Sequence, residues 1–359
     1  MQPSFTKYTL ANGLQVLLKE IHTVPLISHW IWYRVGSRNE QPGQTGISHW
    51  VEHMQFKGTD KFPAGVLDKA ISRDGGYWNA MTYLDWTAYF ETLPAEHIQL
   101  ALDLEADRMI HSHFDEKEVE SERTVIISEL EGGKNHPLHR LGDAVQAKCF
   151  DLHPYRNEVI GSEEDLRAIT REDLYQYYRR NYAPNNAILA IAGDFDTAEM
   201  KARIEDTFGD IPPYQMPVFP IDQDAPLQGT RHVEISGASE TAFLQVAYRA
   251  PQGGTREFLA MILLDSILTG PTSLNLFSAG ITNKTSRLYQ KLVLSHQAVS
   301  LRGSVAATMD PYLYDITVTL HPSSDHDTVL HSIDEEIERL QQELVPPEEL
   351  ARAVKQQRA

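Results

Sequence analysis

Hydrophobic and polar positions alternate in the first part of the chain, which is the pattern of β-strands with one buried face. Residues 5–10 and 14–18 are joined by Ala11-Asn12-Gly13, and this combination predicts a hairpin. We predict a further strand at 26–33, and two strands rich in Tyr, Trp and Thr within 77–93. Between them, residues 45–56 have the spacing of a helix with one apolar side.

The spacing then becomes helical over a long stretch of the chain. It predicts helices at about 95–111, 116–131 and 137–149 and two shorter ones within 162–182, followed by a buried strand at 186–193. The segment from Pro212-Pro213 to Gly229 is rich in Pro, Gln and Asp and has no periodicity, which indicates a linker. We therefore predict an N-terminal domain at 1–212, a linker at 213–229 and a C-terminal domain at 230–359.

The pattern restarts after this linker. A strand-like segment at 242–248 is followed by an apolar helix at 258–268, which echoes the strand at 26–33 and the helix at 45–56. The echo predicts two related α+β halves. The second half is shorter, and the chain ends in a helical pattern at 347–359 without a stop signal, so we expect this domain to be incomplete at its C-terminus.

Length and composition set the broad class of protein. A chain of 359 residues with 42% hydrophobic residues is long enough for two globular domains. No apolar run is long enough for a membrane span and no signal peptide is visible, so we expect a cytoplasmic protein, or a periplasmic one if a leader was removed. Cys149 is the only cysteine, which excludes an intrachain disulfide.

The balance of charges restricts the partners. The net charge is −18, from 32 basic and 50 acidic residues. Because phosphate binding needs a basic surface, nucleic acid is not expected as a partner. The acidic residues either form a solvated surface or, if they line a cavity, favour cationic peptides.

The residues with the clearest chemistry lie in the predicted helix 45–56. His49-Trp50-Val51-Glu52-His53 reads H-x-x-E-H, which reverses the H-E-x-x-H order of many zinc peptidases and is the inverzincin signature. In a helix, His49 and His53 lie on one face, one turn apart, and can present both imidazoles to one metal ion. Glu52 is close enough to act on a metal-bound water. A catalytic zinc needs a third protein ligand and an open position.

A second acidic pair offers the third ligand. Glu122 and Glu129 are seven residues apart, so a helix places them on one face, with apolar residues between them. Two carboxylates on a half-buried helix are costly unless a cation compensates them. We predict Glu129 as the third zinc ligand and Glu122 as an auxiliary carboxylate of the catalytic site. The alternative for Glu122 is an acid that only stabilises the helix N-terminus.

These two motifs together resemble those of the pitrilysin/insulysin family of zinc metallopeptidases, which includes the mitochondrial processing peptidase. The resemblance rests on H-x-x-E-H followed further along the chain by E-R-x-V-x-x-x-E, and it extends over both halves. Supporting blocks are Gly46, Phe56-Lys57-Gly58-Thr59, Asn79-Ala80-Met81-Thr82 with Asp85 and Tyr89, Ala106-Asp107-Arg108-Met109, His153-Pro154-Tyr155, Tyr182-Ala183-Pro184-Asn185-Asn186 and Gly193-Asp194.

The resemblance implies a clamshell of two homologous α+β domains, with zinc on the N-terminal one. It also implies that Asn79, Ala80 and Met81 belong to an edge strand on which a substrate peptide pairs through its backbone. The expected activity is that of a zinc endopeptidase that cleaves peptides or unfolded segments in a two-domain chamber. Glu52 is the expected general base, which takes a proton from a zinc-bound water.

Two other functions compete with this one. The family contains non-catalytic subunits that bind peptides or scaffold a hetero-oligomer, and their expected mark is a broken metal motif. Here the four residues of the motif are intact. A purely structural zinc site usually contains cysteines, and a single cysteine argues against it.

One departure from the family concerns the second domain. Members that act alone have an arginine and, seven residues later, a tyrosine that contact the substrate near the scissile bond. Val293 and Ser300 stand at those positions here, whereas Arg287 and Tyr289 match a neighbouring block. A partner subunit can supply the missing pair. The alternatives are a homodimer, or a chain that works without the pair.

Overall fold

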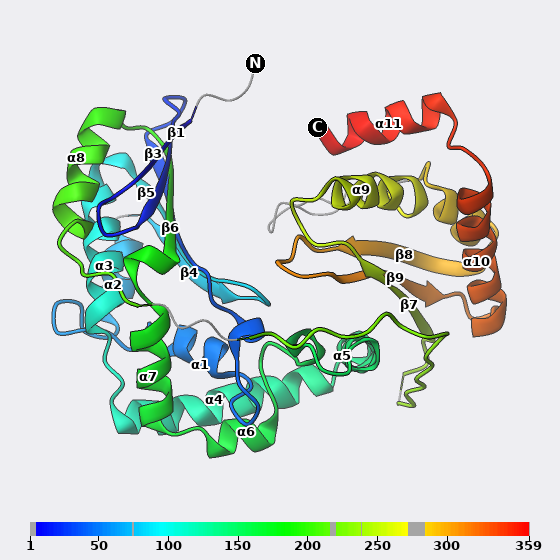
Figure 1. Cartoon of the computed structure of the whole chain (residues 1–359), viewed down its shortest axis with the longest axis horizontal. Coiled ribbons are helices and arrows are strands. Elements are labelled where there is room, and N and C mark those ends of the chain that lie inside the picture. Colours follow the sequence, from blue (N-terminus) through cyan, green and yellow to red (C-terminus); the bar gives the residue numbers. More distant parts are fainter. Residues whose placement is uncertain (1–4, 74, 216–219, 238, 272–283, 359) are drawn as a thin grey trace. The chain divides into compact units, whose positions relative to one another are not determined.

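The computed structural model describes residues 5–73, 75–215, 220–237, 239–271 and 284–358. Residues 216–219 of the predicted linker and residues 1–4 of the N-terminus lie outside the described residues. The chain divides into two compact units (Figure 1). The first unit contains residues 1–133 and 152–224, and the second contains residues 134–151 and 225–359. Residues 134–151, which the sequence placed in the N-terminal domain, thus make their contacts within the second unit.

The first unit is built on a six-stranded sheet with the strand order β1-β2-β6-β3-β5-β4. Its strands are β1 (Thr6–Thr9), β2 (Gln15–Glu20), β3 (Leu26–Tyr33), β4 (Tyr77–Thr82), β5 (Thr87–Pro94) and β6 (Ala187–Gly193). β2 and β6 run parallel, and the other neighbouring strands run antiparallel. β4 stands at one edge of the sheet, so one side of its backbone faces away from β5.

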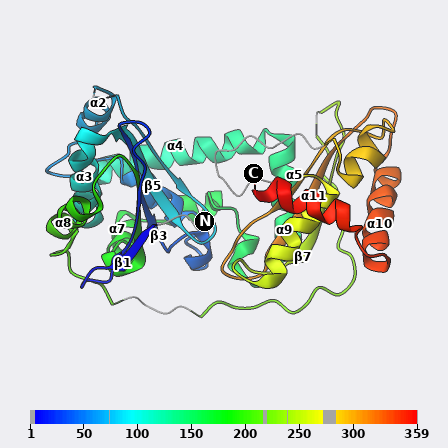
Figure 2. The same cartoon turned by 90° about the horizontal axis from the view of Figure 1, so that it is seen from above.

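The helices of this unit lie beside one face of the sheet and beyond one of its ends (Figure 1). They are α1 (Ile47–Met54), α2 (Val66–Arg73), α3 (Ile98–His111), α4 (Glu116–Lys134), α6 (Glu163–Ala168), α7 (Arg171–Asn181) and α8 (Thr197–Phe208). α3 and α8 cover one face of the sheet (Figures 1 and 2). The strands and most of the helices match the sequence-based predictions, whereas α2 and α8 were not predicted. Among the described residues, no helix combines the length and the hydropathy needed to cross a bilayer.

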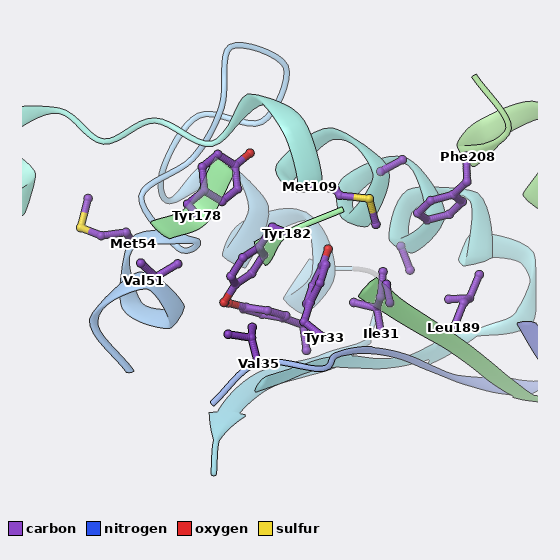
Figure 3. Packing of buried hydrophobic residues seen from close by; sticks show 14 of the residues in the cluster. Ile31, Tyr33, Val35, Val51, Met54, Met109, Tyr178, Tyr182, Leu189 and Phe208 are labelled. Atoms are coloured by element: carbon purple, nitrogen blue, oxygen red, sulfur yellow. The ribbon is translucent and has the colours of Figure 1, made fainter. Parts of the chain in front are cut away.

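The core of the first unit lies between the sheet and these helices. Along β3, Ile27, His29, Ile31 and Tyr33 alternate with less buried residues, as expected of a strand with one face in the core. Tyr33 packs against Tyr182, with ring centroids 4.3 Å apart, and both belong to the same cluster as Met109 of α3 (Figure 3).

A group of charged side chains is buried on the same face. His29 Nδ1 is 2.8 Å from Glu91 Oε2, and Arg108 Nε donates to Glu105 Oε2 at 2.8 Å. The Arg108 guanidinium also lies 3.5 Å from Glu91 Oε1 and over the ring of Tyr89. Burial raises the pKa of Glu105, and burial lowers the pKa of His29 to about 4. Arg108 is therefore the cation that offsets two buried carboxyl groups.

The second unit has a three-stranded antiparallel sheet with the order β7-β9-β8. Its elements are α5 (Pro137–Cys149), β7 (Phe243–Ala250), α9 (Arg256–Leu268), a π-helical turn at Tyr289–Val293, β8 (Ala298–Val305), β9 (Tyr312–Leu320), α10 (His326–Gln342) and α11 (Pro347–Arg358). α9 and α10 pack on the sheet, α5 packs against β7, and α11 packs against α9. Cys149 is a buried free thiol.

The two sheets share a topology. In the first unit, β3, β4 and β5 are arranged in the order β3-β5-β4, and α1 lies between β3 and β4 in sequence. In the second unit, β7, β8 and β9 are arranged in the order β7-β9-β8, and α9 lies between β7 and β8. A helix follows the third strand in both units: α3 and α10. This correspondence confirms the α+β fold class and supports the prediction of two related halves.

Replacing Arg108 by Met should destabilise the first unit by about 3–5 kcal/mol, because Glu91 and Glu105 lose their buried cation. All five tryptophans lie in this unit, so tryptophan fluorescence during urea unfolding measures its stability. The control is Arg167→Met, which removes an exposed ion pair with Glu163 on α6 and should have little effect. Similar unfolding midpoints for the two variants would contradict the role given to Arg108.

Candidate metal centre

Helix α1 carries the H-x-x-E-H motif, and contacts outside the helix hold both of its ends. Gly46 precedes α1 with φ 88°, and a Cβ at this position would collide with the carbonyl oxygen of Ile160. The Glu40 carboxylate accepts hydrogen bonds from the Gly46 and Ser48 amides, each at 2.9 Å, which satisfies donors that the helix start leaves unpaired. At the other end, Ser112 Oγ donates to Gln55 Oε1 at 2.7 Å.

The carboxylate of Glu40 is buried, and this burial raises its pKa to about 7, although the bonds from Ser48 and Gly46 act in the opposite direction. Ser48 makes a further contact, because its hydroxyl lies 2.7 Å from the Tyr177 hydroxyl of α7. Helix α1 is therefore fixed against α7 as well as at its ends.

The three predicted zinc ligands come together in the structure. His49, His53 and Glu129 each offer a ligand atom, and these atoms lie within 4.8 Å of one another. The Nε2 atoms of His49 and His53 are 3.2 Å apart, and Glu129 Oε2 is 4.0 Å from the first and 3.7 Å from the second. The Glu129 side chain is 52% exposed, so solvent reaches one side of the group. Two imidazoles and one carboxylate are a donor set that zinc prefers.

Glu122 lies behind His53. Its Oε1 is 2.9 Å from His53 Nδ1, and its Oε2 pairs with the Lys57 ammonium group. A hydrogen bond from His53 Nδ1–H leaves the lone pair of Nε2 free for a metal ion, so this contact fits a zinc ligand. Burial opposes the charged form of Glu122, but the hydrogen bonds from His53 and Lys57 keep its pKa below the usual value.

The two histidines have different environments. Burial and the neighbouring His53 lower the pKa of His49 to about 3. For His53, burial works against the charged form, yet the hydrogen bond to Glu122 and the nearby carboxylates raise the pKa overall. His49 is therefore neutral and able to act as a ligand.

Glu52 is the fourth residue of the motif and is almost fully buried. Its Oε2 accepts a hydrogen bond from Thr82 Oγ1 at 2.8 Å. Burial raises the pKa of Glu52, and the bond from Thr82 partly offsets this effect. In the sequence, Thr82 and Lys57 stand out only as parts of segments that resemble the family, and their contacts with Glu52 and Glu122 were not predicted. No periodicity reveals their contacts, because each depends on how separate elements pack.

The predicted peptide-binding residues Asn79, Ala80 and Met81 lie in edge strand β4, but they do not share one face. Ala80 packs against the main core, whereas Trp78 packs against a smaller cluster, with its ring 4.7 Å from that of Phe56. Asn79 and Met81 point to the opposite face, as the pleat requires. Asn79 Oδ1 accepts a hydrogen bond from the Ala80 amide at 2.9 Å. Their role in substrate binding stays a prediction.

The positions that lack the arginine and tyrosine lie in the second unit. Val293 ends the π-helical turn and packs against the core, whereas Ser300 is an exposed residue of β8. Arg287 makes two hydrogen bonds to the Glu349 carboxylate, at 3.0 and 2.7 Å. Its guanidinium group therefore has a structural role within the second unit.

A two-unit α+β fold whose first helix carries an inverted zinc motif defines a class of zinc metallopeptidase-like proteins, and comparison with known proteins agrees. The family model for insulinase (peptidase family M16) matches residues 15–163, and the model for the peptidase M16 inactive domain matches residues 168–357. The uncharacterized zinc protease YmxG of Bacillus subtilis is 30% identical over 76% of this chain and 65% of its own length. The probable mitochondrial-processing peptidase subunit beta of Arabidopsis thaliana is 30% identical over 56% of this chain and 38% of its own length.

A solved structure, that of a protease from Helicobacter pylori, matches with a TM-score of 0.89 and 26% identity over 98% of this chain and 83% of that chain. The chain belongs to the insulinase family, peptidase family M16. This confirms the family resemblance found in the sequence. The chain spans less than two thirds of the length of the two curated relatives named above.

Replacing Glu122 by Gln should weaken zinc binding by about 10–100-fold, because the hydrogen bond that orients His53 loses its charge. The affinity can be measured by competition with a coloured chelator. The matched control is Glu118→Gln, one turn earlier on α4, since Glu118 also lies near Lys57, at 3.7 Å, whereas the contact with His53 is made by Glu122. An unchanged zinc affinity in the Glu122 variant would contradict the support given to His53.

Proposed function

We propose that this protein is a zinc-dependent endopeptidase that hydrolyses peptide bonds in peptides or unfolded segments. One observation carries the proposal: His49, His53 and Glu129 offer converging ligand atoms, and the buried Glu52 lies one residue before His53 on the same helix. The zinc-protease names of relatives support the choice of metal. The activity, the substrates and the partners are all part of the proposal.

His49, His53 and Glu129 hold the zinc, with Glu122 behind His53. Bound zinc would polarise a water molecule and lower its pKa, and would also polarise the scissile carbonyl. Glu52 accepts a proton from the attacking water and later delivers it to the amine of the leaving peptide. Its place in a helix that is fixed at both ends limits the movement of its backbone during these transfers.

The peptide binds as an added strand at the free edge of β4, with Asn79, Ala80 and Met81 as its neighbours. Backbone hydrogen bonds provide most of the binding in this mode and make few demands on the substrate sequence. The side chains of such a peptide alternate between the two faces of β4. The net charge of −18 favours cationic segments among the possible substrates if the acidic residues line the substrate chamber.

A partner chain completes the site for the substrate in this proposal. Val293 and Ser300 replace the arginine and tyrosine that orient the substrate in family members that act alone. The relative from Arabidopsis is, by its name, one subunit of an assembly. The partner is a second family member that carries the pair, because a second copy of this chain has Val293 and Ser300 as well. The alternatives are a homodimer, or a chain that works without the pair. A non-catalytic subunit is the competing function, and its expected mark is a broken metal motif.

Cleavage of quenched fluorescent peptides by the purified chain should stop on addition of a chelator and return with zinc. The mechanism needs a metal that polarises water, and magnesium, the control, binds poorly to a site with two imidazoles. Zinc-restored cleavage would support a chain that is active alone. A protein that binds one zinc but cleaves nothing would support the missing partner or the non-catalytic subunit.

Replacing Glu52 by Gln should leave the zinc content unchanged and reduce kcat by about 10²–10⁴-fold, because the variant lacks the general base. Zinc content is measured by elemental analysis and kcat with the same peptides. Glu129→Gln is the matched variant, and it should lose zinc together with activity. Normal turnover by a zinc-loaded Glu52→Gln protein would overturn the assignment of the base.

A further inference from the structure

Thr82 is not among the residues assigned above to zinc, to proton transfer or to the peptide. It is the last residue of β4, and its hydroxyl lies 2.8 Å from Glu52 Oε2. We propose that Thr82 is a positioning residue that holds the Glu52 carboxylate in the orientation needed for proton transfer. This inference rests on the proposed function, because Glu52 needs an orientation only if it acts as the base.

The pleat of β4 directs the Thr82 side chain toward α1. Successive residues of a strand point to opposite faces, and Ala80, two residues earlier, packs against the core on the face where α1 lies. Thr82 pairs with Thr87 of β5 in the register of the sheet. The contact with Glu52 therefore depends on this register, and a shift by one residue would turn the hydroxyl away.

The number of available protons decides whether the Thr82 hydroxyl donates to Glu52 or to Thr87. A threonine hydroxyl has one proton to donate. Thr87 uses its proton on the carbonyl oxygen of Val35, at 2.9 Å, and its oxygen is 3.5 Å from Thr82 Oγ1. Glu52 Oε2 is the nearer acceptor for the proton of Thr82, at 2.8 Å. The hydroxyl thus donates to the carboxylate.

This bond commits one oxygen of the carboxylate and leaves the other for the water. A glutamate has three side-chain torsions, so a carboxylate without a fixed partner can take several orientations. Among the described residues, Thr82 makes the only side-chain hydrogen bond to Glu52. A small misplacement of a catalytic group can cost up to about 10²-fold in rate.

The same strand links the base to the substrate. Asn79, Ala80 and Thr82 all belong to β4, so the proposed peptide edge and the group that orients the base are parts of one rigid element. A peptide paired with β4 is therefore held in register with the carboxylate that acts on it.

The test compares Thr82→Val with Thr82→Ser. Valine keeps the shape but removes the donor, and we expect kcat to fall about tenfold or more with little change in KM, zinc content or thermal midpoint. Serine keeps the donor and should retain most of the wild-type kcat. The matched control is Thr92→Val in β5, which pairs with Tyr77 at the far end of the same ladder and should leave kcat unchanged.

Equal kcat values for wild type and Thr82→Val would overturn the inference, as would a Thr82→Ser variant that is as slow as the Val variant. A lower thermal midpoint with unchanged kcat would show a structural contact only. A wild-type protein that loads zinc but does not cleave would point to the missing partner or to the non-catalytic subunit, and would leave no kcat to compare. In that case, crystal structures of the zinc-loaded proteins still decide the inference: a single, unchanged Glu52 orientation in Thr82→Val would overturn it.

Discussion

The candidate site depends on how helix α1 is held in place. An eight-residue helix is too short to be stable alone in water, so its geometry comes from its neighbours. Glu40 binds the amides at its start, Ser112 binds Gln55 at its end, and Ser48 contacts Tyr177 of α7. Because both ends are fixed, the face of α1 that carries His49 and His53 is held toward Glu122 and Glu129 of α4.

One face of helix α4 carries two carboxylates with different contacts. Glu129 reaches toward the Nε2 atoms of both histidines, whereas Glu122, two turns earlier, binds Nδ1 of His53. The half-exposed carboxylate thus faces the metal position and the buried one orients a ligand. Lys57, just beyond the end of α1, pairs with Glu122 and connects the two helices a second time.

The sequence predicted much of the fold and brought out the candidate ligands that the structure places together, because helix and strand positions follow from local periodicity. A helix fixes which residues share a face, so His49 with His53 and Glu122 with Glu129 could be paired without coordinates. The contact between Thr82 and Glu52 could not, because it depends on the register of β4 and on the packing of α1. Helix 137–149 was predicted with its observed bounds, but its place in the second unit follows from tertiary contacts that no periodicity encodes.

In the second unit, the helix that corresponds to α1 lacks the H-x-x-E-H motif, and other contacts occupy the same face. Helix α9 has the topological place of α1, and its Asp265 and Thr269 are four residues apart, as His49 and His53 are. Asp265 Oδ1 accepts hydrogen bonds from Thr269 Oγ1 at 2.6 Å and from the Tyr314 hydroxyl at 3.0 Å. Asp265 is fully buried, and a Cβ at Gly303 would collide with its carboxylate. The corresponding helix face is therefore closed by hydrogen bonds and packing, whereas the histidine face of α1 contributes to an open ligand group with Glu129.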